Sequence, residues 1–374
     1  MKHPERMNPL LAGVRILDLS RLLPAPFCTQ YLAQLGAEVI KIEEPGGDYT
    51  RGMSMEMFSL VNRGKRSVVL DLKNADDVAL LKRMAADADV LVESFRPGVM
   101  DRLGCGYEAL RAINPRLVYA ALTGYGHTGP YRERAGHDMN YLGYAGVLDQ
   151  SGNAGAAPAI ANVQIADLAG GGLTCALAIV AAVVGARDSG EGTFVDSAML
   201  DGALALQVAA TATLRTIGRT QPRGEDMLTG ALPNYSVYET ADRKHVAFGA
   251  LEMKFFHKFL QAAGQTALIK LPMAPGAAGQ PLRDALTALF KSRTRDEWEA
   301  LGAEADCCLG GIYTLEEALA NPQVQARGLW SHDAAGKPQF EFPVRFSNAA
   351  TCGGVAPALG ADTAAVRAQF SARS

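Results

Sequence analysis

Two side chains able to carry a proton, His137 and Asp167, stand in one glycine-rich stretch of the sequence, Gly124 to Gly172. Imidazole titrates close to neutral pH, which suits a group that must both take and give a proton. The preceding Gly136 permits a ligand to approach the backbone closely. A lone histidine is more often a satisfied core residue, so these residues alone leave both interpretations of His137 open. A loop this long between regular elements favours a functional role.

Asp167 directly precedes a long apolar run that begins at Leu168, and two interpretations fit it equally well. Aspartate is a favoured helix N-cap, although the residue three positions on, Gly170, cannot complete a capping box. The run from Ala169 to Gly172 predicts a helix start without bulky side chains. Exposed N–H groups at such a start would hold a carbonyl oxygen as it becomes negative, with Asp167 as the acid or base.

Charged residues elsewhere form a second set of candidates. Glu252, in the sequence Gly-Ala-Leu-Glu-Met, fits either the start of a helix or a site acid. Six basic residues fit either a solvated surface or a site for a polyanion such as a nucleotide phosphate. These six are Arg63, Lys65, Arg66, Lys73, Arg96 and Arg102.

The composition excludes several classes of protein. With a net charge of −3 over 374 residues, the chain has no electrostatic reason to bind nucleic acid. Its six cysteines form no CxxC pair and no metal-ligand spacing, so we expect no metal and a reducing, cytoplasmic location. The N-terminal residues lack the apolar core of a signal peptide. The apolar run Leu168 to Ala186 is rich in glycine and alanine, which favours a buried helix and no membrane association.

Short apolar runs alternate with helical patterns over the first part of the chain, which predicts an α/β fold with a parallel, doubly wound sheet. The expected strands are Val14–Ser20, Glu38–Glu43, Arg66–Leu72, Asp89–Phe95, Arg116–Thr123 and Thr193–Ser197. The expected helices are Pro24–Leu35, Asn74–Ala88, Leu168–Ala186 and Asp201–Ile217.

The positions of the glycines do not match those of a dinucleotide-binding site. No GxGxxG follows the first expected strand, where such a motif would bind the pyrophosphate. The sequence Gly124-Tyr-Gly-His-Thr-Gly129 matches the spacing, but Pro130 and charged residues follow it in place of an apolar helix. We interpret it as a turn.

The character of the sequence changes near Gly218, which predicts a second, smaller α+β domain. A hairpin is expected over Tyr235 to Gly249, and helices near Met253–Ala263, Leu282–Lys291 and Leu315–Asn321. We therefore expect a large domain over residues 1–218, a small domain with its linkers over 219–330, and a C-terminal segment over 331–374 that returns to the large domain.

Several long motifs resemble the family III coenzyme A (CoA) transferases, the CaiB/BaiF family, which also includes the α-methylacyl-CoA racemases. They are VRILDLSRLLPAPFCTQYLAQLGAEVIKIEEPGG from Val14, NRGKRSVVLDLK from Asn62, ESFRPGVMDRLG from Glu93, NPRLVYAALTGYGHTGP from Asn114 and IADLAGGG from Ile165. The resemblance covers essentially the whole chain. It implies a Rossmann-like large domain, a small domain and an interlocked homodimer, with sites between the large domain of one chain and the small domain of the other.

The resemblance also implies an enzyme that acts on acyl-CoA, with CoA as part of the substrate and without a prosthetic group. In the transferases the aspartate at position 167 is a nucleophile. In the racemases it is one of two proton carriers, and the other is the histidine of a GHDxNY motif. Glu252 matches the racemase glutamate near that histidine. The motif here is Gly136, His137, Asp138, Met139, Asn140 and Tyr141.

The resemblance assigns the CoA contacts to Leu70, Leu72, Lys73, Ser94, Phe95, Arg96 and Arg102. Two features depart from the racemase pattern. Glu44 stands where a racemase relative carries a CoA-binding arginine, so Lys41 or Lys65 is expected to substitute, and Val163 stands where racemases tend to have a polar residue. The flexible glycine run of many transferases is absent at Gly249-Ala-Leu-Glu-Met.

We therefore predict an α-methylacyl-CoA racemase-like enzyme in which His137 and Asp167 exchange the α-proton through an enolate. The alternative is a CoA transferase that moves CoA between carboxylic acids through an intermediate on Asp167. A third possibility is an acyl-CoA-binding protein without catalytic activity.

Overall fold

A computed structural model describes residues 9–371 of the chain. It divides into two compact units, and each is described by itself. The first comprises Met1–Val147, Ala161–Leu206 and Arg327–Ser374, and the second comprises Leu148–Ile160 and Gln207–Ala326.

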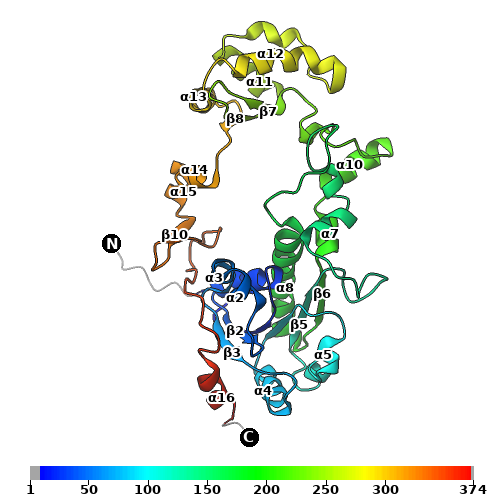
Figure 1. Cartoon of the computed structure of the whole chain (residues 1–374), viewed down its shortest axis with the longest axis vertical. Helices are drawn as coiled ribbons and strands as arrows, with labels where there is room; N and C mark the ends of the chain where they lie inside the picture. The colour runs from blue at the N-terminus through cyan, green and yellow to red at the C-terminus, as the bar shows by residue number, and fades with distance from the viewer. Residues whose placement is uncertain (1–8, 372–374) are drawn as a thin grey trace. The chain divides into compact units, whose positions relative to one another are not determined.

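A parallel sheet forms the centre of the first unit (Figure 1). Among the described residues it has six strands in the order β3-β2-β1-β4-β5-β6. The strands are β1 Arg15–Leu19, β2 Glu38–Glu43, β3 Arg66–Val69, β4 Val90–Glu93, β5 Val118–Thr123 and β6 Phe194–Ala198. The strand order reverses between β1 and β4, and open α/β sheets bind ligands beyond the carboxyl ends of their strands at such a point. The predicted α/β class with a parallel sheet is confirmed.

Local sequence signals explain several of the helices of the first unit. Pro24 opens α1 with its fixed φ, and the Asn74 side chain caps α4 by accepting a hydrogen bond from the backbone N–H of Asp76 at 2.8 Å. The helices are α1 Pro24–Gln34, α2 Tyr49–Met53, α3 Met55–Asn62, α4 Ala75–Ala86, α5 Val99–Arg102, α6 Tyr107–Arg111, α7 Asp138–Tyr144, η2 Ala166–Leu173, α8 Thr174–Ser189 and α9 Met199–Ala205.

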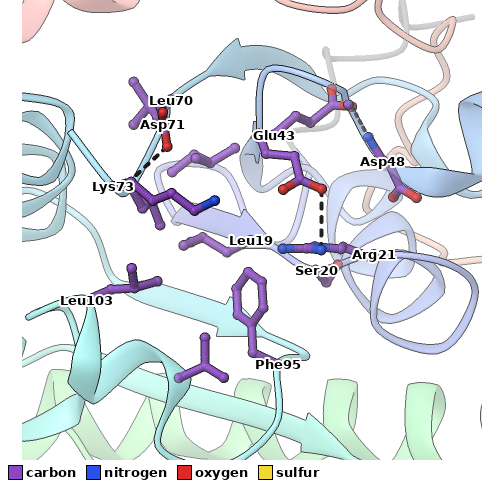
Figure 2. A pocket seen from close by; sticks show the side chains of 15 residues that line it. Leu19, Ser20, Arg21, Glu43, Asp48, Leu70, Asp71, Lys73, Phe95 and Leu103 are labelled. Carbon is purple, nitrogen blue, oxygen red and sulfur yellow. Dashed lines mark hydrogen bonds and ion pairs between the residues drawn. The ribbon is translucent and has the colours of Figure 1, made fainter.

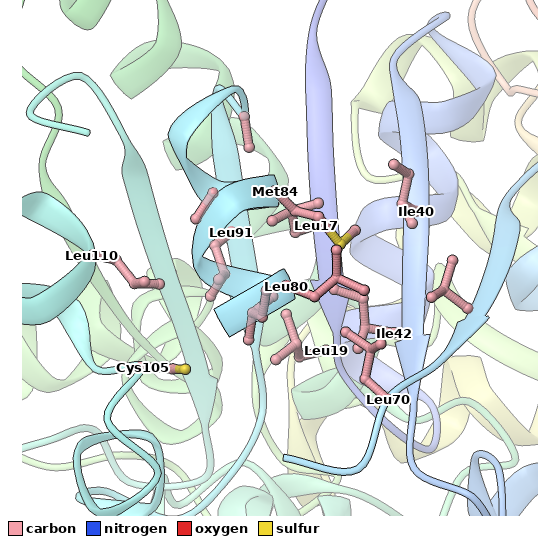
Figure 3. Close-up of a cluster of buried hydrophobic side chains, with 14 of the residues drawn as sticks. Leu17, Leu19, Ile40, Ile42, Leu70, Leu80, Met84, Leu91, Cys105 and Leu110 are labelled. Atoms are coloured by element: carbon pink, nitrogen blue, oxygen red, sulfur yellow. The ribbon is translucent and has the colours of Figure 1, made fainter. Parts of the chain in front are cut away.

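One hydrophobic core of the first unit lies between the sheet and α4 (Figure 3). Leu17, Ile40 and Leu91 from the strands meet Leu80 and Met84 from α4, and all five side chains are buried. Strands covered on both faces contain near-continuous apolar runs, which is the pattern that predicted them. The core leaves the carboxyl ends of the strands free to form a site.

The C-terminal segment closes the edge of this sheet at β3. The backbone N–H groups of Ser67 and Val69 donate to the side chains of Asp362 and Thr363, each at 3.0 Å. The segment contains β10 Trp330–His332, β11 Pro338–Phe340 and α16 Thr363–Ser371. In Figure 1 the red α16 lies beside α4 and β3, and its Val366 is part of the core.

The second unit is a small α+β unit. Its described residues form a three-stranded antiparallel sheet, which confirms the hairpin predicted over Tyr235 to Gly249. The strands are β7 Tyr235–Glu239, β8 His245–Gly249 and β9 Leu309–Gly311. The helices are η1 Leu148–Gln150, α10 Val208–Ile217, η3 Met227–Thr229, α11 Met253–Ala262, η4 Thr266–Lys270, η5 Gly276–Gly279, α12 Gln280–Phe290, α13 Arg295–Ala305, α14 Leu315–Leu319 and α15 Pro322–Arg327. Its core joins Phe248, Phe259, Phe290 and Trp298.

One expectation about the elements was wrong, and several helices were not predicted. The single helix predicted from Asp201 to Ile217 is two helices, because Gln207 has a ψ of 50°, outside the helical region. The chain passes from the first unit to the second at this break. Helix α13 was not predicted, although Thr294 and Glu297 form a capping box at its start.

Candidate functional site

Asp167 lies on η2, a stretch of π-helix that runs directly into α8. The preceding Ile165 and Asp167 itself are already helical, so the interpretation of Asp167 as an N-cap is wrong. π-Helical turns are rare and often occur at functional sites, because the wider turn changes the direction of one side chain. The aspartate is half-buried.

The glycines after Asp167 serve helix packing, which corrects the expectation of an open helix start. Gly170 and Gly171 are buried, and a Cβ on Gly170 would lie 2.7 Å from the backbone nitrogen of Ala203 in α9. A Cβ on Gly172 would lie 2.9 Å from the Phe27 ring in α1. The three glycines therefore allow η2 to pack closely between α1 and α9, and they do not present an anion site.

Together η2 and α8 form a continuous, strongly apolar helix, Ala166–Ser189. By length and composition alone this helix could cross a membrane, but the core helix of a soluble protein satisfies the same criteria. Its glycine face packs within the first unit, while Leu177 and Val184 are exposed.

Helix α7, which begins directly after His137, contacts η2, which carries Asp167. The backbone N–H of Asp167 donates a 3.0 Å hydrogen bond to Oδ1 of Asp138, the residue that follows His137. The backbone N–H of His137 donates to Oδ1 of Asn140 at 3.0 Å, which fixes the start of the helix. The His137 side chain is exposed. Asp138 thus links the backbone of Asp167 to the start of α7, next to His137.

The environment of Asp167 changes its acidity. Burial, with a further contribution from the charge of Asp138, raises the pKa of Asp167 from 3.8 to about 7. A carboxyl group with a pKa close to neutral is present in both protonation states at working pH. Asp167 is therefore suited to accept and to donate a proton.

The predicted motif around His137 is held by Tyr141. Its hydroxyl donates to the carbonyl oxygen of Gly136 at 2.6 Å. A Cβ on Gly136 would lie 2.7 Å from the Tyr141 ring, so only glycine fits there. The ring also packs edge-on against Tyr125 at 5.1 Å between centroids. Met139 is exposed.

A cavity of about 220 Å³ lies at the carboxyl ends of β1, β2, β3 and β4 (Figure 2). It is lined by four of the residues predicted to contact CoA, namely Leu70, Leu72, Lys73 and Phe95. Apolar walls with a charged rim suit a flat heterocycle attached to phosphate groups.

The remaining predicted CoA contacts lie close to this cavity or on the surface. The hydroxyl of Ser94 accepts a hydrogen bond from the backbone N–H of Arg21 at 3.1 Å. The side chains of Arg96 and Arg102 are exposed, and a Cβ on Gly98 would lie 3.5 Å from Nη1 of Arg102.

Lys41 and Lys65 do not reach this cavity, contrary to the expectation that one of them replaces the missing arginine. Nζ of Lys65 lies 3.0 Å from Oδ2 of Asp18, and Nζ of Lys41 lies 2.9 Å from Oδ2 of Asp48, with both lysine side chains fully buried. Burial lowers the pKa of Lys65 to about 8, and Asp18 acts in the opposite sense. Both ammonium groups are committed to the interior of the sheet.

Arg21 is a cavity residue that the sequence analysis missed. Its guanidinium lies 3.3 Å from the carboxylate of Glu44 and donates to the hydroxyl of Tyr49 at 2.6 Å. The side chain follows the carboxyl end of β1, and this position next to the strand order reversal is the signal that could have identified it.

Glu252 belongs to the second unit, where it precedes α11 and is exposed. Its negative charge contributes to a raised pKa of Cys308, after the larger effect of burial. Among residues 9–371, no group of three His, Cys, Asp or Glu side chains is placed to hold a metal ion.

The family model described as CoA-transferase family III matches residues 11–363. An alpha-methylacyl-CoA racemase of Homo sapiens is 37% identical over 319 residues, which cover 85% of this chain and 81% of that protein. A succinate–glutarate CoA-transferase of Agrobacterium fabrum is 36% identical over 349 residues, 87% of this chain and 85% of that protein.

Solved structures agree with the fold. A CaiB/BaiF family protein from Brucella suis superimposes with a TM-score of 0.86 at 33% sequence identity. The match covers 97% of this chain and 100% of that chain.

Proposed function

Because this chain belongs to CoA-transferase family III and is an enzyme of that family, we propose that it inverts the α-carbon of 2-methylacyl-CoA thioesters. The observation that carries the proposal is the environment of Asp167, which is half-buried and has a pKa raised to about 7. Its backbone N–H is hydrogen-bonded to Asp138, the residue after His137.

A thioester carbonyl acidifies the carbon next to it, so the α-proton can leave to form an enolate. Inversion requires a base on one face of that carbon and an acid on the other, because a single group that returned its own proton would restore the starting centre. His137 and Asp167 fill these two roles and exchange them with the direction of the reaction.

The enolate oxygen requires a hydrogen-bond donor, and α7 supplies one in place of the buried glycines. The backbone N–H groups of Asp138 and Met139 form the first turn of α7 and have no acceptor among the described residues. A donor fixed in this way costs no reorganisation as charge develops on the oxygen. Glu252, in the second unit, is proposed to orient or tune His137.

The nucleotide end of the acyl-CoA would occupy the cavity at the strand ends, where Leu70, Leu72 and Phe95 form the apolar wall and Lys73 contributes a cation. CoA is then part of the substrate, and the reaction needs no prosthetic group. We place the enzyme in the cytoplasm.

We further propose a homodimer whose chains interlock, with the second unit of one chain completing the site of the other. The structure leaves large apolar side chains exposed on several helices, and exposed apolar side chains that form a contiguous patch mark interaction sites. They include Leu177 and Val184 on α8, Leu204 on α9, and Val208, Leu214 and Ile217 on α10.

The competing function is transfer of CoA between two carboxylic acids, with Asp167 as the nucleophile. The similarity to a succinate–glutarate CoA-transferase supports it. In that reaction Asp167 acts only in its ionised form, whereas a pKa raised to about 7 suits a residue that both accepts and donates a proton.

Deuterium uptake at the α-carbon distinguishes the two functions. Each pure enantiomer of a 2-methylacyl-CoA is incubated with the enzyme in heavy water, with and without an added carboxylic acid. The racemase exchanges the α-proton and inverts the centre without any acceptor acid. Transfer of CoA to the acid with no α-exchange would establish the transferase instead.

A further inference from the structure

The guanidinium of Arg21 is held at the rim of the strand-end cavity with part of its donor capacity unused. We propose that Arg21 is the cation that binds a phosphate of the CoA nucleotide in this chain, with Glu44 as its positioning partner. This inference rests on the proposed function, because it names the group that the same cavity takes from acyl-CoA.

The donors of Arg21 divide into an occupied and an unoccupied set. Nη1 donates to the Tyr49 hydroxyl at 2.6 Å and lies 3.3 Å from Oε1 of Glu44. Nε and Nη2 donate to no described residue. Arginine recognises phosphate through two parallel N–H groups, and the unoccupied Nε and Nη2 form such a pair.

Two aromatic rings fix the plane of this guanidinium. Its central carbon lies 4.6 Å from the centroid of the Phe95 ring and 5.0 Å from that of Tyr49. Figure 2 shows Phe95 beneath Arg21 at the cavity. An arginine already held in place loses less side-chain entropy when it binds a ligand.

The backbone at Arg21 is also constrained. Its N–H donates to the Ser94 hydroxyl at 3.1 Å. The next residue, Leu22, has a φ of 65°, which a leucine seldom adopts, and its N–H donates to Oδ1 of Asp48 at 3.1 Å. An unfavourable conformation of this kind persists only where surrounding contacts hold it, and it is common at ligand sites. Here it directs the preceding arginine to the cavity.

Two cationic residues are available to bind a phosphate in the cavity. Arg21 and Lys73 are the only cationic residues that line it within the described chain. The carboxylate of Glu43 is paired with Arg51 at 2.7 Å, and that of Asp48 is paired with Lys41. Two acidic side chains of the lining are thus already neutralised. Lys73 has no side-chain partner within the described residues and provides the second positive charge.

Calorimetric titration of the full-length protein with three probes tests the inference. The probes are CoA, 3′-dephospho-CoA and pantetheine, which lacks the nucleotide. Arg21→Ala is expected to weaken CoA binding by about tenfold or more, since a hydrogen bond to a charged group contributes at least that factor. Pantetheine binding should not change. If only CoA binds more weakly, Arg21 contacts the 3′-phosphate. If 3′-dephospho-CoA loses the same affinity, Arg21 contacts the diphosphate. Either result supports the role of Arg21.

A matched control and a rescue accompany this variant. Arg111 also lies over a tyrosine ring and near a glutamate, but outside the cavity, so Arg111→Ala should bind all probes as the wild type does. Position 44 lies beside the Arg21 guanidinium, so Glu44→Arg in the Arg21→Ala background should restore CoA affinity to within about threefold of wild type.

Three results would overturn the assignment. In the first, the wild type binds CoA and Arg21→Ala binds it with the same affinity. This result contradicts the role of Arg21 and leaves the proposed function standing. Another is a double variant that binds CoA as weakly as Arg21→Ala. A wild type that binds neither CoA nor 3′-dephospho-CoA would refute the proposed function together with the inference.

Discussion

The backbone N–H of Asp167 and the carboxylate of Asp138 are joined by a hydrogen bond of 3.0 Å. The bond places a second negative charge beside Asp167, and that charge adds to the effect of burial in raising the pKa of Asp167 to about 7. One carboxylate thus both orients its neighbour and adjusts the pH at which it exchanges a proton.

Replacing Asp138 by asparagine separates these two effects. The amide side chain would keep an oxygen acceptor for the N–H of Asp167 but remove the negative charge, so the pKa of Asp167 should fall. In the direction where Asp167 is the base, kcat/KM should rise as pH passes the pKa of Asp167, and in the reverse direction kcat/KM should fall. Both of these transitions should move to lower pH in Asp138→Asn.

Asp188→Asn, an exposed substitution on α8, serves as the control and should leave both transitions unchanged. Transitions that stay near pH 7 in Asp138→Asn would contradict the effect of the Asp138 charge on Asp167.

Asp167→Asn should reduce racemisation by about 10²–10⁴-fold, because asparagine cannot accept and donate the α-proton.

Asp167→Asn should also make the protein more stable at high pH. The pKa of Asp167 is raised on folding, so its ionisation lowers stability as pH rises from about 4 to 7. Urea unfolding at pH 8 should therefore show a gain of ~1–3 kcal/mol for the variant, and at pH 4 almost none. A variant less stable than wild type at pH 8 would show that Asp167 is structural.

His137→Ala should lose inversion of both enantiomers while keeping one-sided proton exchange. Asp167 remains, so the enantiomer whose α-proton faces it can still exchange that proton with deuterium. The acid on the opposite face is missing, so the centre cannot invert, and the loss should be about 10²–10⁴-fold. Glu252→Gln should reduce the rate of inversion less than His137→Ala does, if Glu252 only orients or tunes His137. Exchange and inversion are followed separately for each pure enantiomer, and wild-type inversion in His137→Ala would rule out the two-base mechanism.

Gly202→Ala should destabilise the site helix through a backbone collision. A Cβ at this position in α9 would overlap the carbonyl oxygen of Gly170 in η2. Overpacking of this kind typically costs ~1–3 kcal/mol. Gly185→Ala is the matched control, because a Cβ there meets nothing within 4 Å and alanine favours the helix by ~1 kcal/mol. Urea midpoints for the two variants should move in opposite directions; a stable Gly202→Ala would mean that α9 can shift away from η2.

The protein should remain a dimer on dilution, because interlocked chains cannot separate without partial unfolding. Light scattering at decreasing concentration gives the mass of the assembly. Leu177→Asp, on the exposed face of α8, should weaken or prevent assembly. An active monomer would contradict both the interlocked arrangement and a site shared between chains.

The sequence patterns predicted the sheet well because its strands are short, apolar and separated by clear helix signals. Glu38–Glu43 has the bounds that were predicted, and Asn74 caps α4 as its position indicated. The local geometry of Asp167 could not be predicted in the same way. Its π-helical turn depends on close packing against α1 and α9, and these helices are distant in sequence.

The roles of the charged residues around the strand ends could not be predicted from the sequence either. Lys41 and Lys65 resembled candidate phosphate ligands by type alone, but their partners Asp48 and Asp18 become neighbours only in the folded sheet. Arg21 and Glu44 are on separate segments and form their ion pair only after β1 and β2 lie side by side. Burial and pairing, which decide the role of a charged group, are properties of the fold and not of spacing.

The closure of the β3 edge by the C-terminal segment has a consequence for biosynthesis. On the ribosome, β1 to β6 emerge first and residues 207–326 of the second unit follow. Asp362 and Thr363, which accept hydrogen bonds from the N–H groups of Ser67 and Val69, emerge only afterwards. During that interval β3 is an unprotected edge strand able to pair with a strand of another nascent chain. Neighbouring ribosomes on one message therefore bring together chains that are prone to aggregate.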